Sequence, residues 1–275
     1  MAIGMIENVG RHTKQSIAEF GEFCRFAGST FAWMWRGALK WRNWREVFPQ
    51  MYEVGTRSIP VISITGMFIG MVLAIEAYTQ FKSIGQENHL GGVISTSVVK
   101  QIGPVLAAVM LAGRVGGSLT AELGTMNVTE QLDALRVMGA EPVRVLVVPR
   151  FIGCVLMTPL LTIYSDALGS LGGWFICVKT LGVPNGPYWE HARTAVDLWT
   201  LNEGLFKSVF FGAAIGLISC YKGFTCRAGA SGVGRACTES FVASFMAIIV
   251  LNFFFAKIAK DWYTELYGIR SIFGG

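Results

Sequence analysis

The chain has 275 residues, of which 52% are hydrophobic and 15% are charged, and its formal net charge is +5. Soluble domains carry about 25% charged residues, so this composition excludes an ordinary soluble domain and favours an all-α integral membrane protein. The positive charges lie at the ends of apolar segments rather than in one patch, which argues against nucleic-acid binding.

The N-terminal region, residues 1–50, is expected to contain an amphipathic helix lying in the cytoplasmic membrane interface. Residues 16–39 alternate apolar and basic positions, with several aromatic side chains among them. This pattern is typical of a helix that lies on a bilayer rather than crossing it. The first fifteen residues lack the apolar run of a cleavable signal, so we expect the N-terminus to stay in the cytoplasm. Residues 51–275 are expected to form one membrane domain.

Five apolar segments follow, and each approaches the roughly 20 residues that a membrane-spanning helix needs. They cover approximately residues 59–81, 93–112, 151–178, 204–219 and 241–258. The first and fourth contain GxxxG pairs, Gly66 with Gly70 and Gly212 with Gly216, which permit close helix approach, although glycine as simple filler remains an alternative. Pro159 predicts that the third helix is packed against neighbours that satisfy its freed backbone groups.

Ionisable residues inside the predicted spans are candidates for function because burying a charge in a bilayer is costly. Glu76 lies near the far end of the first span, where we expect it to reach the boundary. Lys100 and Gln101 lie within the second span. Asp166, in the third, is expected to face protein or a cavity.

The segment from Gly113 to Pro142 is polar and separates two apolar spans. Asn127 as N-cap, Glu130 three residues later and Gly139 as stop predict a short helix over residues 127–139. Its apolar face comprises Val128, Leu132, Leu135 and Met138. Two interpretations stay open at this point: the helix lies on lipid headgroups, or it docks a soluble partner.

The distribution of Lys and Arg predicts the orientation of the chain. With the N-terminus inside, the cytoplasmic segments hold fifteen of them and the opposite segments hold six. Positive charge is retained on the cytoplasmic side of membrane proteins. The 127–139 helix is therefore expected in the cytoplasm and the C-terminus on the other side.

Motifs for nucleotide hydrolysis, metalloproteolysis and serine hydrolysis are missing from the sequence, which predicts a protein that is not an enzyme and holds no cofactor or metal. The six cysteines form no CxxC pair and are expected to be free thiols. Energy for any active transport would come from an ion gradient or from a partner.

Three stretches carry a resemblance to a known family. They are GMFIGMVLAIEAY in the first span, QIGPVLAAVMLAGRVGGSLTAELGTMNVTEQLDALRVMGAEPVRVLVVPR across the second span and the polar segment, and GASGVGRACTESFVAS before the fifth span. Together they resemble the MlaE-like permeases of MCE-associated lipid ABC transporters. The match runs from about Tyr52 to the end of the fifth span, and ELGTM with TEQLDALRVMG is its most specific part.

The resemblance implies a homodimeric permease of the bacterial inner membrane, with two cytoplasmic ABC ATPase subunits that bind ATP and Mg²⁺ and an extracytoplasmic MCE-domain hexamer. Such a complex moves phospholipid or a related lipid between the inner membrane and the MCE carrier. The ATPase of the family docks on the segment that corresponds to residues 120–141, which favours docking for the 127–139 helix. The implied coupling residues are Glu122, Val128, Thr129, Glu130, Leu132, Asp133, Leu135, Arg136 and Met138, and Gly124 and Gly139 are implied to set the ends of the coupling helix.

The family's lipid cavity, carried over by motif, implies six substrate-binding residues: Leu73, Tyr78, Phe81, Ile84, Lys100 and Gln101. The family commonly has an acidic residue where Gln101 stands. Lys100 is therefore expected to engage lipid directly, to pair with another group such as Glu76, or to reach water. Two other functions remain as alternatives: an ion-coupled secondary transporter in which Glu76, Lys100 and Asp166 form a charge relay, and a structural anchor for an MCE assembly.

Overall fold

The computed structural model describes residues 2–37 and 41–267, and this part of the chain consists of helices joined by short turns, with no strand. Five helical rods within it are long and apolar enough to cross a membrane: Arg45–Ser83, Glu87–Val128, Val143–Thr180, Leu198–Phe224 and Ala230–Trp262. This confirms the prediction of an all-α membrane protein with five spans. Each rod extends beyond its predicted apolar core, because the helical backbone continues into flanking segments that hydropathy does not mark.

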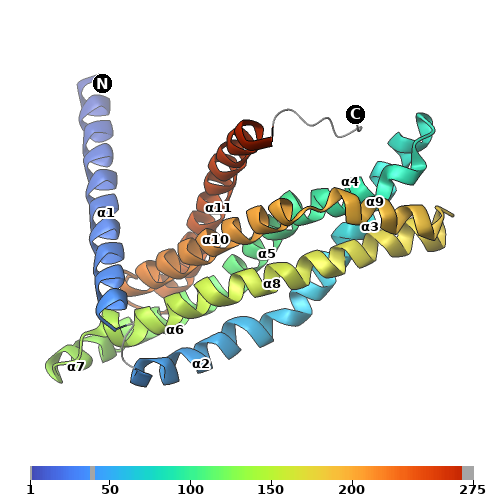
Figure 1. The fold of residues 1–275 in the computed structure, drawn as a ribbon. Helices are drawn as coiled ribbons and strands as arrows, with labels where there is room; N and C mark the ends of the chain where they lie inside the picture. Colours follow the sequence, from blue (N-terminus) through green and yellow to red (C-terminus); the bar gives the residue numbers. More distant parts are fainter. Residues whose placement is uncertain (1, 38–40, 268–275) are drawn as a thin grey trace.

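The elements follow in chain order (Figure 1). An N-terminal helix α1 (Ala2–Gly37) precedes α2 (Trp41–Gly55). The first rod starts at Arg45 within α2 and continues through η1 (Thr56–Ser58) and α3 (Ile59–Ser83). The second rod consists of η2 (Glu87–His89), α4 (Leu90–Ser97), η3 (Val98–Ile102), α5 (Gly103–Leu111), η4 (Ala112–Gly116) and α6 (Gly117–Val128), and α7 (Gln131–Val137) follows it. The remaining elements are η5 (Val143–Val147), α8 (Val148–Trp174), η6 (Phe175–Thr180), α9 (Asn185–Ala195), α10 (Leu198–Phe224) and α11 (Ala230–Tyr267).

The core forms where α8 lies against α3 on one side and α10 on the other. A Cβ added to Gly70 of α3 would lie 1.8 Å from the carbonyl oxygen of Gly169, and one added to Gly212 of α10 would lie 2.6 Å from that of Cys154. Only glycine permits backbones to approach this closely. Both predicted GxxxG pairs therefore serve close helix packing rather than filling space.

Helix α1 crosses one end of the bundle instead of running along it (Figure 1). Its second half is held by aromatic contacts, in which Phe26 meets Tyr221 and Phe224 and Phe31 meets Phe151. This is the arrangement expected of a helix lying along a membrane surface. The predicted end of this helix at residue 39 lies outside the described residues.

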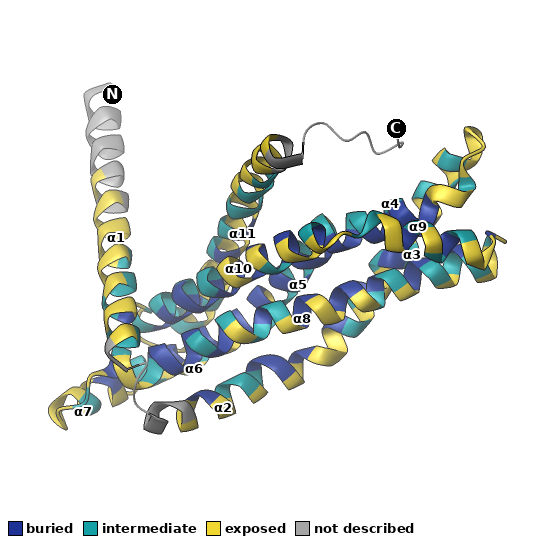
Figure 2. Ribbon diagram, in the orientation of Figure 1, coloured by how far each residue is buried: buried dark blue, intermediate teal, exposed yellow. Residues whose placement is uncertain are grey.

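Helix α11 packs against the bundle at its N-terminal half and diverges from it toward its C-terminal half. Its first half packs on α10 and α6, where Ser240 donates a hydrogen bond to Ser219 at 3.2 Å and Ile248 is fully buried. Beyond that point its side chains are largely exposed, and the α11 rod is the least buried of the five (Figure 2).

Two predicted loops are wrong in extent. The polar stretch 179–202 contains α9, which packs against α4, and the fourth rod begins at Leu198 rather than at residue 204. The glycine-rich stretch 228–236, expected to be a tight turn, turns only as far as Gly229 (φ +89°), and α11 starts at the next residue. Both helical segments were predicted as loops because a short amphipathic or glycine-containing helix lacks the long apolar run by which a span is recognised.

Candidate functional site

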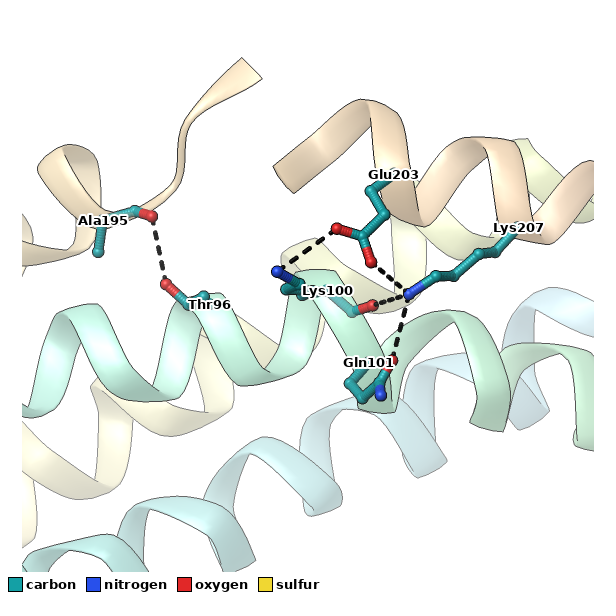
Figure 3. Close-up of polar contacts among 6 residues, drawn as sticks. All are labelled: Thr96, Lys100, Gln101, Ala195, Glu203 and Lys207. Carbon is teal, nitrogen blue, oxygen red and sulfur yellow. Dashed lines mark hydrogen bonds and ion pairs between the residues drawn. The ribbon is translucent and has the colours of Figure 1, made fainter. Parts of the chain in front are cut away.

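Four polar side chains, Lys100, Gln101, Glu203 and Lys207, form a cluster between the second rod and α10 (Figure 3). Glu203 and Lys207 are buried, whereas Lys100 is partly exposed and Gln101 is exposed. The ammonium group of Lys207 donates to Glu203 Oε1 at 2.6 Å, to Gln101 Oε1 at 3.3 Å and to the carbonyl oxygen of Lys100 at 3.4 Å. Lys100 Nζ forms an ion pair with Glu203 Oε2 at 3.4 Å. Lysine has three donors, so Lys207 is fully satisfied although its side chain is only 1% exposed. We call these four residues the polar cluster.

Local sequence explains why α10 and the second rod meet here. Pro104 lacks an N–H and so cannot donate to the Lys100 carbonyl four residues earlier, which leaves that oxygen available to Lys207. The π-helical turn η3 adds a further distortion at the same place. On α10, a Cβ at Gly204 would lie 2.6 Å from the carbonyl oxygen of Val99, so this glycine permits the contact between the two helices.

The counter-charge of Lys100 is Glu203, not Glu76. Glu76 is exposed on α3, whereas the Glu203 side chain is 5% exposed. Glu203 lies one residue before the predicted start of the fourth span, so its place inside the bundle was missed. It supplies the negative charge that Gln101 lacks.

Asp166 of α8 is buried, as predicted. A Cβ at Gly103 would lie 1.7 Å from the Oδ1 atom of Asp166, and this atom has no hydrogen-bond partner within the described part of the chain. The ion pairs found among the described residues do not join Asp166 or Glu76 to Lys100. The geometry therefore does not assemble the charge relay required by the secondary-transporter alternative.

The six predicted substrate-binding residues fall into two groups. Leu73, Tyr78 and Phe81 of α3 pack on a buried cluster built by α4, η6 and α9, and the Tyr78 hydroxyl donates to the carbonyl oxygen of Leu181 at 3.5 Å. Ile84, just after α3, is 64% exposed. Lys100 and Gln101 face α10 instead. The apolar and polar parts of the predicted set thus belong to different packing environments within this single chain.

The predicted helix over residues 127–139 is shorter than expected, and its predicted N-cap is wrong. Asn127 lies in the last turn of α6, and its Nδ2 donates to the carbonyl oxygen of Cys226 at 3.3 Å. The chain then breaks at Glu130, whose φ of +59° is left-handed, and α7 begins at Gln131. An N-cap residue has extended backbone, so neither Asn127 nor Glu130 forms the expected capping box.

The predicted stop at Gly139 is confirmed. Gly139 has φ +75°, its N–H donates to the carbonyl of Arg136 at 3.0 Å, and the N–H of Ala140 donates to that of Leu135 at 3.0 Å. These two bonds define a Schellman motif, which requires a left-handed residue that glycine adopts without strain. The end of α7 is therefore fixed by its own sequence.

The apolar face predicted for this helix is only partly buried. Leu132 is 2% exposed and anchors α7, while Met138 is 72% exposed and the unpredicted Val137 is 89% exposed. Among the predicted polar residues, Asp133 pairs with Arg136 at 2.7 Å and both are exposed. Glu122 lies on α6, outside the short helix, and holds Arg150 of α8 at 2.6 Å. The tip of α7 thus presents an exposed surface made of Val137, Met138, Asp133 and Arg136, which we call the α7 tip.

Residues 47–258 match the family model described as Permease MlaE. The chain belongs to the MlaE permease family. It is 34% identical to the intermembrane phospholipid transport system permease protein MlaE of Haemophilus influenzae over 220 residues, which cover 78% of this chain and 84% of that protein. A probable ABC transporter permease protein of Rickettsia typhi is 34% identical over 258 residues, covering 94% and 98% of the two chains. The chloroplastic protein TRIGALACTOSYLDIACYLGLYCEROL 1 of Arabidopsis thaliana is 34% identical over 239 residues, covering 86% and 67%.

Membership of the MlaE permease family confirms the resemblance drawn from the sequence motifs, and five apolar rods make this MlaE-family chain a multi-pass membrane protein. Glu203 and Lys207 were the functional candidates that sequence reasoning missed. Their spacing of four residues could have revealed them, because opposite charges at i and i+4 share one helix face. Within an apolar helix, such a spacing predicts that both side chains are buried and that their opposite charges neutralise each other.

Proposed function

We propose that this chain is the permease subunit of an ABC transporter that moves phospholipid between a bacterial inner membrane and an extracytoplasmic MCE-domain carrier. The family match over residues 47–258 carries this proposal, since relatives of similar length are named phospholipid or ABC permeases. The chain works as a homodimer with two ATPase subunits that bind ATP and Mg²⁺. Its N-terminus and α7 lie in the cytoplasm and its C-terminus lies in the periplasm.

The polar cluster supports a role in handling a lipid headgroup. It holds two ammonium groups and one carboxylate, so it carries one net positive charge inside an apolar bundle. Lys207 is fully occupied, whereas the Lys100 side chain is 43% exposed and can donate to a further acceptor. A phosphate or carboxylate on a lipid is such an acceptor, and charge-assisted hydrogen bonds are strong where water is scarce.

The second rod links this cluster to the α7 tip. Lys100 and Val128 belong to the same rod, and 28 residues of helix span about 42 Å. Leu132 is buried and holds α7 against the rest of the permease, while the α7 tip stays exposed. A partner that moves α7 therefore also exerts a force on the rod that carries Lys100. If the ATPase binds one arrangement of the bundle more tightly than another, its closure can therefore shift the equilibrium toward that arrangement.

The test of coupling is a double substitution at the α7 tip, Val137→Asp with Met138→Asp. Both side chains are exposed, so the spans should fold normally, while co-purification with the ATPase subunit should be lost. Leu198→Asp is the matched control, since Leu198 is 81% exposed at the start of α10, at the other end of the bundle. ATPase binding retained by the double variant, or lost equally in the control, would contradict the assignment.

A further inference from the structure

A buried carboxyl group that takes no part in the polar cluster lies in the third rod. Asp166 of α8 is 9% exposed and lies well inside the Val143–Thr180 rod. Its Oδ1 atom has no hydrogen-bond partner among the described residues, and none of the ion pairs found among these residues includes it. Buried polar atoms are almost always satisfied, so this carboxyl group requires an explanation.

Asp166 lies against the π-helical turn η3. A Cβ at Gly103, the residue that follows η3, would lie 1.7 Å from Asp166 Oδ1 and 2.9 Å from the carbonyl oxygen of Val98. The carboxyl group and this carbonyl oxygen therefore lie next to each other, in space that glycine leaves free. Gly169 shares a helix face with Asp166, and a Cβ there would lie 2.9 Å from Val98 Cγ1. Helix α8 thus packs closely on the start of the η3 turn.

The protonation state of Asp166 follows from these surroundings. An ionised carboxylate inside a membrane span is costly without a paired cation, whereas a neutral carboxylic acid carries an O–H donor that needs only one acceptor. The carbonyl oxygen of Val98 has two lone pairs, and the N–H of Gly103 donates to it. One lone pair therefore remains for the proton of a neutral Asp166.

The two carbonyl oxygens that follow Val98 meet α10. A Cβ at Gly204 would lie 2.6 Å from the Val99 oxygen. The Lys100 oxygen accepts a hydrogen bond from Lys207 at 3.4 Å. A π-helical turn departs from the regular hydrogen-bond pattern of an α-helix, so contacts from neighbouring helices help to fix its shape. Lys100 lies within this turn, and the direction of its side chain depends on that shape.

We propose that Asp166 is a positioning residue for Lys100. As a neutral acid it donates a hydrogen bond to the carbonyl oxygen of Val98 and thereby holds the η3 turn from α8, while α10 holds it at Val99 and Lys100. The effect on transport rests on the proposed function, whereas the hydrogen bond itself does not. Asp166 then neither binds a cation nor passes on a proton.

Infrared spectroscopy of the purified permease at neutral pH tests the protonation state. The wild type should show the carbonyl stretching band of a neutral carboxylic acid, and Asp166→Asn should remove that band. Thr162→Val is the matched control and should keep it, because Thr162 is fully buried on the same helix and its hydroxyl donates to the carbonyl of Thr158 within α8. A difference spectrum between the wild type and Asp166→Asn without this band would overturn the proposal.

Phospholipid transport by the complete complex in vesicles tests the positioning role. Asp166→Asn retains a donor and the shape of the side chain, so kcat and KM should stay close to those of the wild type. Asp166→Leu has the same branching but no donor, so the KM for phospholipid should rise about three- to tenfold. A residue that only stabilised the fold would instead reduce the amount of active protein, and therefore the apparent kcat, at an unchanged KM.

Thermal unfolding in the same detergent checks that each variant is folded. Loss of transport in a folded Asp166→Asn variant would show that the ionisable group itself is needed, as in a relay, and would overturn the proposal. An unchanged KM in a folded Asp166→Leu variant would also overturn it. If Asp166→Leu does not fold, the infrared band and the Asp166→Asn kinetics still decide. A wild-type complex that moves no phospholipid would contradict the proposed function, and the infrared band would still decide whether Asp166 is a neutral donor.

Discussion

Removing the carboxylate of Glu203 should destabilise the protein more than removing either lysine of the polar cluster. Glu203 is the counter-charge of both Lys207 and Lys100, at 2.6 and 3.4 Å. Glu203→Leu therefore leaves the Lys207 ammonium, whose side chain is 1% exposed, without a negative partner. Breaking a buried pair in this way costs about 3–5 kcal/mol. Lys207→Met should cost less, because Glu203 keeps its ion pair with Lys100.

The double variant Glu203→Leu with Lys207→Met should recover most of the loss. Replacing both members of a buried pair by apolar residues is often neutral, and Lys100 is exposed enough to be solvated. Lipid transport should nevertheless fall, because the groups that position Lys100 are gone. The expected order of stability is wild type close to the double variant, then Lys207→Met, then Glu203→Leu.

Thermal unfolding in detergent measures this order. At about 2–4 °C per kcal/mol, Glu203→Leu should lower the midpoint by about 6–20 °C. Glu239→Leu is the control, since Glu239 pairs with Lys222 at 2.9 Å at the surface, where a pair is worth about 0–1 kcal/mol. A Lys207→Met variant less stable than Glu203→Leu, or a double variant with the summed loss, would refute the reasoning.

Two glycines give further predictions. Gly204→Ala places a methyl group 2.6 Å from the Val99 carbonyl oxygen, so α10 must move away from η3. The free energy of unfolding should fall by about 1–3 kcal/mol, which is measured as a lower thermal midpoint. Gly234→Ala, which meets no atom within 4 Å, should leave that midpoint unchanged or raise it, and an equal fall in both variants would argue against the contact. Gly139→Ala forces alanine to φ +75°, which costs about 1–2 kcal/mol, so the end of α7 should fray. The affinity for the ATPase should then fall by up to about 30-fold in a titration. Unchanged affinity would mean that the Schellman end does not matter for docking.

The sequence by itself determined the five spans, because a backbone in lipid must satisfy its own hydrogen bonds and its side chains must be apolar over a fixed length. It also determined the end of α7, since a left-handed terminus needs glycine and the two bonds of Gly139 and Ala140 are local. The close helix contacts at Gly70 and Gly212 were visible as glycine pairs, although their partners on α8 were not.

Only the tertiary structure decided where the charges meet. Lys100 and Glu203 are 103 residues apart, and their ion pair depends on Gly204 and on a π-helical turn that hydropathy does not record. The same is true of the α7 start: Asn127 has the chemistry of an N-cap, but its side chain bonds to Cys226 from the turn before α11. A side chain that can satisfy either a local or a distant partner takes the one that packing brings within reach, and packing is a property of the whole fold.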